Sequence, residues 1–335
     1  MIAARQIAFG RGAAPGPTPA YWGLCFTAGQ ANSTVRLVKN GNISPKTIMY
    51  STDGETWSAY TFGIDIVLEN VGDKVWMKAG EGGNPDGWFI SVMVYYRFRM
   101  TGLVAASGNL MSIVDGETET FTAKNFQALF QGCKSLTTAP ELPATTLVKN
   151  CYNSMFQGCT SLTTAPELPA TTLATNCYLK MFYGCSSLIS VPAALPAETL
   201  FAGTNIRSGC YGQMFQNCTS LTTAPALPAT ALVAYCYQQM FSGCTSLTTA
   251  PELPATTLAD GCYFQMFRGC SSLATVRTQQ TQAFSDEASE SNPTLEWIEG
   301  VAETGTFYCP AVLGTNETIS RGVNACPEGW TVVNI

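Results

Sequence analysis

Histidine is absent from the 335 residues of the chain, and charged residues make up only 12% of them. Histidine is the commonest general base and metal ligand in proteins, so its absence argues against most acid–base and metal chemistry. The net charge is −6 and no basic cluster is present. Because binding to nucleic acid requires clustered Lys and Arg, nucleic acid is excluded as an expected partner.

Long apolar runs are also missing, since no stretch approaches the roughly 18–20 apolar residues of a membrane helix. We therefore expect no membrane insertion. Residues 1–20 lack the apolar run of about 7–15 residues that a secretory signal needs. The chain has no nucleophile elbow, no phosphate-binding loop and no paired carboxylates at a meaningful spacing. These absences predict a non-enzymatic protein with no cofactor and no metal, and the low charge suits an assembly or an extracellular setting.

The N-terminal third divides into two zones. Residues 1–19 contain Pro15, Pro17 and Pro19 and are predicted to be an extended anchoring arm. Residues 20–112 contain short alternating runs separated by turn pairs such as Asn40-Gly41, a pattern that predicts a β-sandwich. Its Trp and Tyr residues are interpreted as core, with a carbohydrate-binding platform as the alternative.

A repeated phrase fills residues 113–276. "MFQGCTSLTTAPELPATTL" at 155–173 returns almost unchanged at 240–258, and its Phe recurs at 130, 156, 182, 215, 241 and 267, in steps of 26, 26, 33, 26 and 26. Fixed periods of 20–29 residues are typical of leucine-rich-repeat solenoids. We predict about six coils, each with a short stacking strand at "LTTAPEL" and a short helix or irregular turn on the other wall. Residues 277–335 are predicted to be a connector and a C-terminal cap. The fold class is thus mainly β with short helices.

Eleven of the 14 cysteines fall into two columns of the repeat. Buried ladders of small thiols are the first interpretation. Disulfides between the columns are a second, and they require an oxidising compartment. A metal site is disfavoured because no C-x-x-C pair occurs. Cys309 and Cys326 lie outside the columns and form a possible disulfide. The columns are Cys133, Cys159, Cys185, Cys218, Cys244 and Cys270, and Cys151, Cys177, Cys210, Cys236 and Cys262.

Positions that differ between copies form the candidate binding surface. They lie before each Cys-Tyr pair and beside each Met-Phe pair, where stacking would align amides, aromatics and a few charges. Such a composition suits recognition of a protein or glycan, and ordinary drift of solvent-facing residues is the alternative. The seven-residue insertion within 201–209 adds Arg207. The candidates are Lys149, Asn150, Asn153, Gln157, Asn176, Lys180, Tyr183, Arg207, Tyr235, Gln238, Gln239, Phe264, Gln265 and Arg268.

An acidic column formed by Glu141, Glu167 and Glu252 suggests calcium binding at first sight. Its equivalents in other copies are Ala194 and Ala226, so the column is broken. Solvated charge beside the strands is therefore the preferred interpretation.

The phrase resembles the BspA-like, or Treponema-type, leucine-rich repeat, through Phe156, Cys159, Leu162, Leu168, Pro169 and Leu173 and their counterparts over about 160 residues. It departs from that pattern by extra residues in each coil and by a second cysteine column. The resemblance implies binding to host proteins, glycans or other cells, and brings no catalytic residues.

Such repeats are found in surface proteins of gut Bacteroidales and in proteins of their phages. We therefore expect a phage virion component, in a tail or fibre, that recognises the host surface through the repeats and other virion proteins through the arm. A bacterial cell-surface adhesin is the alternative. A homo-oligomer, a trimer by analogy, is expected.

Overall fold

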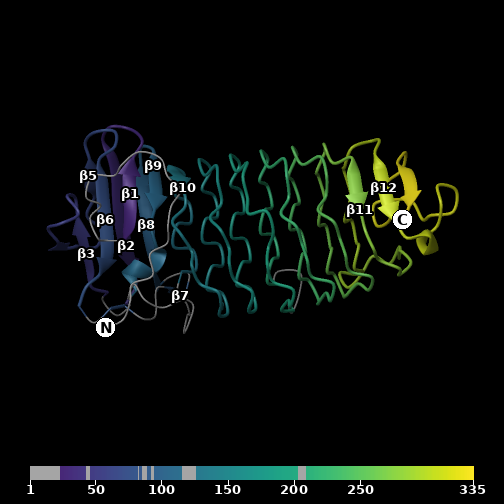
Figure 1. The fold of residues 1–335 in the computed structure, drawn as a ribbon, viewed down its shortest axis with the longest axis horizontal. Coiled ribbons are helices and arrows are strands. Elements are labelled where there is room, and N and C mark those ends of the chain that lie inside the picture. The colour runs from purple at the N-terminus through teal and green to yellow at the C-terminus, as the bar shows by residue number, and fades with distance from the viewer. Residues whose placement is uncertain are drawn as a thin grey trace, which may run out of the picture.

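The computed structural model describes residues 23–42, 46–81, 83–84, 89–91, 94–114, 126–202 and 209–335. The predicted arm at 1–19 and the candidate residue Arg207 lie outside them. The molecule is elongated, with the N-terminal strands at one end, a stack of repeats in the middle and the C-terminal strands at the other end (Figure 1). The prediction of a mainly β protein is confirmed. Helix in the described residues is limited to two 3-10 turns, η1 (Leu110–Ile113) and η2 (Ala311–Leu313).

Two sheets make up the N-terminal end. One has the strand order β10-β9-β1-β6-β3-β4 and the other β5-β2-β8-β7. The alternation in the sequence sets their faces, since in β2 Val35 and Leu37 are buried whereas Thr34 and Arg36 are partly exposed. The strands are β1 (Leu24–Ala28), β2 (Ser33–Asn40), β3 (Ile48–Ser51), β4 (Ser58–Ala59), β5 (Ile66–Leu68), β6 (Lys74–Ala79), β7 (Phe89–Ser91), β8 (Val94–Thr101), β9 (Val104–Ser107) and β10 (Leu136–Thr138).

The core of these sheets continues into the repeats without a break. Phe26 of β1 and Phe98 of β8 have ring centroids 5.0 Å apart, and Phe98 stacks on Phe130 of the first repeat at 4.9 Å. Strand β9 also pairs in parallel with β10, which belongs to that repeat. The N-terminal sheets therefore cover the first repeat and begin the stack.

One wall of each repeat consists of consecutive tight turns. In the first repeat, Leu129, Gln131 and Cys133 donate their N–H groups to carbonyls three residues earlier. The N–H groups between them, at residues 126, 128, 130 and 132, donate to the carbonyls of residues 151, 153, 155 and 157 in the next repeat. Every second amide thus joins neighbouring repeats, which a helix could not do because its amides bond within the helix. Of the two predicted forms of this wall, the turn is observed.

The threonine-rich segments stack on another wall as parallel bridges. Thr138 pairs with Thr164, and Thr164 pairs with Ser190. Regular strands are assigned in this wall only at its two ends within the described residues, at β10 and at β11 (Thr275–Arg277). The prolines after each threonine pair explain the shortness of these pairings, because proline has no N–H to donate.

Two aromatic ladders run through the stack. Phe130, Phe156, Phe182, Phe215, Phe241 and Phe267 are stacked with centroids 5.4–5.7 Å apart. A second ladder begins at Phe126, continues through a tyrosine of each repeat and ends on Trp297. The tyrosines are Tyr152, Tyr178, Tyr211, Tyr237 and Tyr263. These rings are buried and occupy the centre of every repeat.

The cysteine columns are buried thiols. Five thiols of the first column donate to the carbonyl of the ladder phenylalanine in the previous repeat, as Cys185 does to Phe156 at 3.1 Å. The first thiol, Cys133, donates in the same way to the carbonyl of Phe98 in β8 at 3.2 Å. All 14 cysteines are free and buried, so the disulfide considered for Cys309 and Cys326 is not formed in this structure.

The C-terminal end extends the stack beyond residue 276, where the sequence analysis ended the repeats. The amides of Gly261, Tyr263, Gln265, Phe267 and Gly269 donate to carbonyls within residues 291–299, as they would to a further repeat. A parallel sheet of three strands then follows, in the order β11-β12-β13. Strands β12 (Thr306–Cys309) and β13 (Thr331–Asn334) extend it from β11. The connector thus contains one more turn of the same wall.

Candidate functional site

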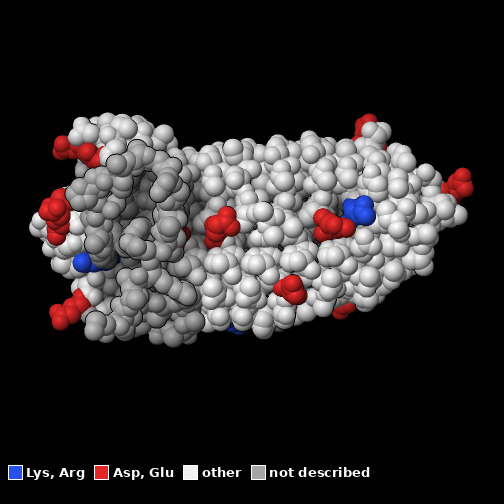
Figure 2. Space-filling model, viewed as in Figure 1, with Lys and Arg blue, Asp and Glu red and all other residues white. Residues whose placement is uncertain are grey.

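The interior of the repeats is filled by the ladders, and many of the residues that distinguish one repeat from another lie at the surface. Figure 2 shows one face of the repeat region, which is mostly uncharged and carries only scattered acidic and basic side chains. Recognition on such a surface depends on hydrogen bonds and shape more than on net charge.

Two adjacent columns flank the Met-Phe pairs on the turn wall, and we call them the amide corner. The corner comprises the residue before each Met and the residue after each Phe, from Ser154 and Gln157 to Gln265 and Arg268. Side-chain amides bond to one another along it: Gln239 donates to Gln265 at 2.6 Å and Gln265 donates to Glu296 at 2.6 Å. Gln213 donates to Gln239 in the same way. These bonds hold the amides in fixed orientations, which lowers the entropy cost of presenting them to a partner.

A charged group ends the amide corner on the C-terminal side. Arg268 lies 2.6 Å from Glu299 and 3.4 Å from Glu296, and all three side chains are more than a third exposed. Exposed ion pairs add little stability, so this group matters more for the local charge pattern than for the fold.

The structure places the predicted surface residues in three groups. Lys149 and Arg268 are exposed, and Asn153, Gln157, Lys180, Tyr183, Gln239 and Gln265 are half-buried. Gln238 and Phe264 are buried, at 0% and 7% exposure, so their prediction as surface residues was wrong. Both lie two residues before a Met of the repeat, in a column that also holds buried Leu179 and half-buried Asn153, so variation in this column does not indicate exposure. Asn150, Asn176 and Tyr235 are half-buried and share a left-handed backbone conformation, with φ of 57–62°.

The left-handed backbone at these positions gives a structural reason for which residues occur there in the different copies. Asn tolerates this region better than most residues, so its recurrence at 150 and 176 has a backbone cause. Lys180, Gln239 and Gln265 also have φ of 50–57°. These columns are therefore not free of structural duty, because their backbone is constrained even though their side chains reach the surface.

Sequence reasoning missed Gln213, Gln216, Glu296 and Glu299, which continue the amide corner. The first two lie in the copy after the long insertion, where the 26-residue step becomes 33. Both flank Met214-Phe215 as the corner residues of the other copies flank their Met-Phe pairs, so the repeat itself carries the signal for them. Glu296 and Glu299 follow the last Met-Phe pair by 29 residues or more and share no phrase with the earlier copies.

A shallow groove of about 260 Å³ lies at the first two repeats. Its residues follow the threonine segments and do not belong to the amide corner. It is lined by the segments Ala139–Pro143 and 166–169, which contribute four prolines and the carboxylates of Glu141 and Glu167.

Within the described residues, no group of three or more Cys, Asp or Glu side chains is placed to hold a metal ion. The described part of the chain also contains no helix of the length and hydropathy required to span a bilayer.

Burial suppresses thiol chemistry throughout the repeats. Desolvation raises the pKa of Cys133, Cys151 and Cys185 to about 12. A thiol with so high a pKa is protonated near neutral pH and is a poor nucleophile. The cysteines therefore have a packing role in this structure.

Comparison with protein families gave a match. The family model described as the BspA type leucine-rich repeat region matches residues 126–211 and 211–300 in six copies. The match covers more than half of the chain. Comparisons with curated proteins and with solved structures gave no match.

Proposed function

Because the chain belongs to the BspA-type leucine-rich-repeat family, we propose that it is a non-enzymatic binding protein whose repeats form a solenoid of six coils. The solenoid presents the amide corner to a protein or glycan on a cell surface. The observation that carries the proposal is the contrast within each repeat. Buried ladders are nearly identical from copy to copy, whereas the amide corner changes from Gln157 to Tyr183 to Arg268.

The chemistry of the amide corner fits this role. Its amides, one tyrosine and terminal arginine offer directional donors and acceptors in a row, and a row of coils repeats them along the molecule. A partner that extends along the stack could contact several coils at once, so weak contacts would add up through avidity.

For the biological setting, we propose a component of a phage virion, in a tail or fibre, that binds the host surface. The low charge and the copied repeats support this setting. The second candidate is a bacterial cell-surface adhesin, which the family favours because its members are typically surface-exposed. Intact mass spectrometry separates the two, since a virion part retains Met1 and free thiols, whereas an exported adhesin has a processed N-terminus and paired thiols.

The binding proposal is tested on whole cells with fluorescently labelled full-length protein. The triple variant Lys180→Ala, Tyr183→Ala, Arg268→Ala removes side chains of the amide corner while leaving the ladders intact. The control variant Thr163→Ala, Thr222→Ala, Thr248→Ala removes three exposed threonines from another wall. We expect cell binding to fall about tenfold or more for the first variant and to change by less than about twofold for the second. Equal loss in both variants, or loss in neither, would contradict the proposal.

A further inference from the structure

Three arginines gather on the outer face of the N-terminal four-stranded sheet. In the pairing of β2 with β8, Arg36 lies directly opposite Arg99, and Val38 lies opposite Arg97. Alternation along β8 puts Arg97 and Arg99 on the same face. Directly opposed residues have Cβ atoms about 4.5–5.5 Å apart, so like charges at Arg36 and Arg99 destabilise the sheet. A chain with only 17 Lys and Arg has placed three of them together.

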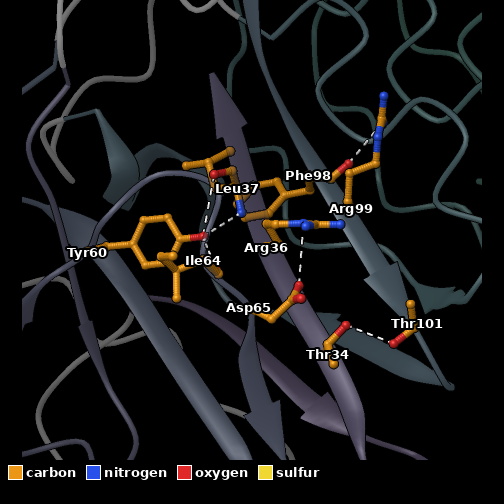
Figure 3. A network of polar contacts seen from close by, with 9 residues as sticks. All are labelled: Thr34, Arg36, Leu37, Tyr60, Ile64, Asp65, Phe98, Arg99 and Thr101. Atoms are coloured by element: carbon orange, nitrogen blue, oxygen red, sulfur yellow. Dashed lines mark hydrogen bonds and ion pairs between the residues drawn. The ribbon is translucent and has the colours of Figure 1, made fainter. Parts of the chain in front are cut away.

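Only one carboxylate of the described residues contacts this group. The Nε of Arg36 lies 3.4 Å from Asp65, and the loop that carries Asp65 is fixed by buried Tyr60. The Tyr60 hydroxyl accepts the N–H of Leu37 at 3.0 Å and donates to the carbonyl of Ile64 at 2.6 Å. Figure 3 shows Arg36 extended toward Asp65, with Arg99 directed away from it. Asp65 therefore neutralises the charge of Arg36, and the other two guanidinium groups have no carboxylate beside them in the described part of the chain.

Arg97 and Arg99 are incompletely satisfied. Arg99 donates Nη1 to the carbonyls of Phe98 and Gln131, each at 3.2 Å. Arg97 stacks on the Tyr95 ring at 4.3 Å, and its Nε is buried without a hydrogen-bond acceptor in the described part of the chain. Desolvation and the charge of Arg99 lower the pKa of Arg97. A buried donor without an acceptor is costly, so this face would gain from an added anion.

We propose that Arg36, Arg97 and Arg99 form a binding site for an oxyanion group, a sulfate or carboxylate, carried by an acidic polysaccharide. Guanidinium groups bind these oxyanions through paired, charge-assisted hydrogen bonds. The same face carries Thr34 and Thr101, whose hydroxyls bond each other at 2.8 Å and lie beside Arg36 and Arg99 in the pairing. Hydroxyls next to cations suit an acidic sugar. A protein interface needs apolar or aromatic anchors at its centre, and the Tyr95 ring on this face is covered by Arg97 at 4.3 Å.

The site adjoins the start of the amide corner, because the Gln131 side chain donates to Gln157 at 2.7 Å. None of its three arginines belongs to the corner, so the site does not depend on the proposed function of the repeats. It lies where the sheet meets the first repeat, as the bond from Arg99 to Gln131 shows. A protein that holds a surface glycan here would keep its repeats free for a second contact on the same cell.

The test titrates the full-length protein with dextran sulfate, and separately with inorganic sulfate, by calorimetry at low and at moderate salt. The double variant Arg97→Gln, Arg99→Gln removes two of the cations. Lys39→Gln removes one cation from the neighbouring strand β2, at an exposed position where the alternation of the strand differs from that of Arg36. Arg277→Gln removes one exposed cation from the C-terminal half of the molecule, outside both proposed sites. Since a charge-assisted bond is among the stronger polar contacts, we expect the double variant to weaken polymer binding about tenfold or more and each control to change it less than about twofold.

Thermal unfolding distinguishes loss of the site from loss of the fold. Without an added anion, the double variant should unfold close to the temperature of the parent, because relief of like-charge repulsion offsets the loss of the two carbonyl bonds of Arg99. With dextran sulfate, the parent should gain more stability than the variant. Equal weakening by Lys39→Gln, or unchanged binding by the double variant, would overturn the site. Binding of inorganic sulfate without binding of dextran sulfate would overturn the assignment to a polysaccharide. So would a competition experiment in which poly-glutamate displaces dextran sulfate as well as dextran sulfate displaces itself.

Discussion

Gly184 has φ of 71° at a position where four other repeats also have glycine and the fourth copy has Asn217, at φ of 61°. No atom lies within 4 Å of the place where a Cβ on Gly184 would be. Its replacement is therefore limited by backbone conformation alone. We expect Gly184→Ala to lower the free energy of unfolding by about 1–2 kcal/mol, the usual cost of a left-handed residue with a Cβ.

Gly184→Asn is the matched control, because Asn already occupies the equivalent place in the next repeat. Urea unfolding of both variants measures the difference in their free energies of unfolding. If Asn costs as much as Ala, the conformational explanation for this column is wrong.

The thiols give a second prediction at the residue scale. All 14 are free and buried, and desolvation raises the pKa of those in the repeats. We expect almost no reaction with a thiol reagent at pH 8 in the native protein, and reaction of all 14 after unfolding without reductant. Rapid native labelling, or a shortfall after unfolding, would contradict the free, buried state.

Single residues were partly predictable from the sequence. The Phe and Cys columns were recognised as packing positions because their letters do not vary. Gln238 and Phe264 were misassigned because variation was equated with exposure, although neighbouring core side chains can change together. The left-handed residues at 180, 239 and 265 could not be found from residue type, since Lys and Gln show no preference for that region.

At the scale of the element, the ladders hold the repeats together. Phe182 stacks on Phe156 at 5.5 Å and on Phe215 at 5.6 Å, and it is fully buried. We expect Phe182→Leu to lower the free energy of unfolding by about 1–3 kcal/mol, because each lost aromatic pair is worth about 0.5–1.5 kcal/mol.

Ile189→Thr is a suitable control in the same repeat. Ile189 is 56% exposed, and the neighbouring copies have Thr163 and Thr222 at the same place. Surface changes of this kind stay within about 0.5 kcal/mol. A Phe182 variant as stable as this control would show that the stack is not the main source of cohesion.

Element types were harder to predict than element positions. The period located each repeat, and the parallel contact of the threonine segments was expected. The choice between helix and turn on the opposite wall was left open, because its apolar spacing fits neither regular period. The alternation of amide bonds within and between repeats decides it, and that pattern depends on a neighbour 25 or more residues away.

At the scale of the whole molecule, the open edge of the last strand is protected. The side chain of Asn316 accepts the N–H of Val332 on the outer side of β13, and the amide of Asn334 donates to the carbonyl of Gly314. Arg321 holds the segment through the Asn316 carbonyl at 3.1 Å and the Trp330 carbonyl at 2.8 Å. Unpaired strand edges invite association with another chain.

We expect Asn316→Leu to associate in a concentration-dependent way, because the Val332 amide loses its acceptor at an exposed edge. Asn316→Asp keeps the acceptor and should sediment as the parent does. Sedimentation velocity over a range of concentrations measures both. Identical behaviour of the Leu variant and the parent would show that other parts of the cap protect the edge.

Stability at high pH is also a property of the whole stack. A thiol exposed to water has a pKa of 9.0, and burial raises the pKa to about 12 for Cys133, Cys151 and Cys262. Above pH 9 the unfolded chain loses these protons while the folded chain keeps them, so stability falls as pH rises toward 12. We expect the urea midpoint to drop between pH 9 and 12, and less steeply in a Cys151→Ala variant. A flat profile would contradict the burial of these groups.

The direction of the bonds between repeats has a consequence for synthesis. On the turn wall, each repeat donates amides to the one that follows it, whereas some amides of the threonine segments, such as that of Ile189 to Thr163, donate to the preceding repeat. The N-terminal sheets supply the surface on which the first repeat stacks. During translation, the N-terminal end emerges first and can serve as the template. Each new coil then completes the one before it, and Trp297 closes the tyrosine ladder last. A ribosome that stops within the repeats would release a chain whose final coil has amides without acceptors, so quality control of this protein depends on finishing its last 60 or so residues.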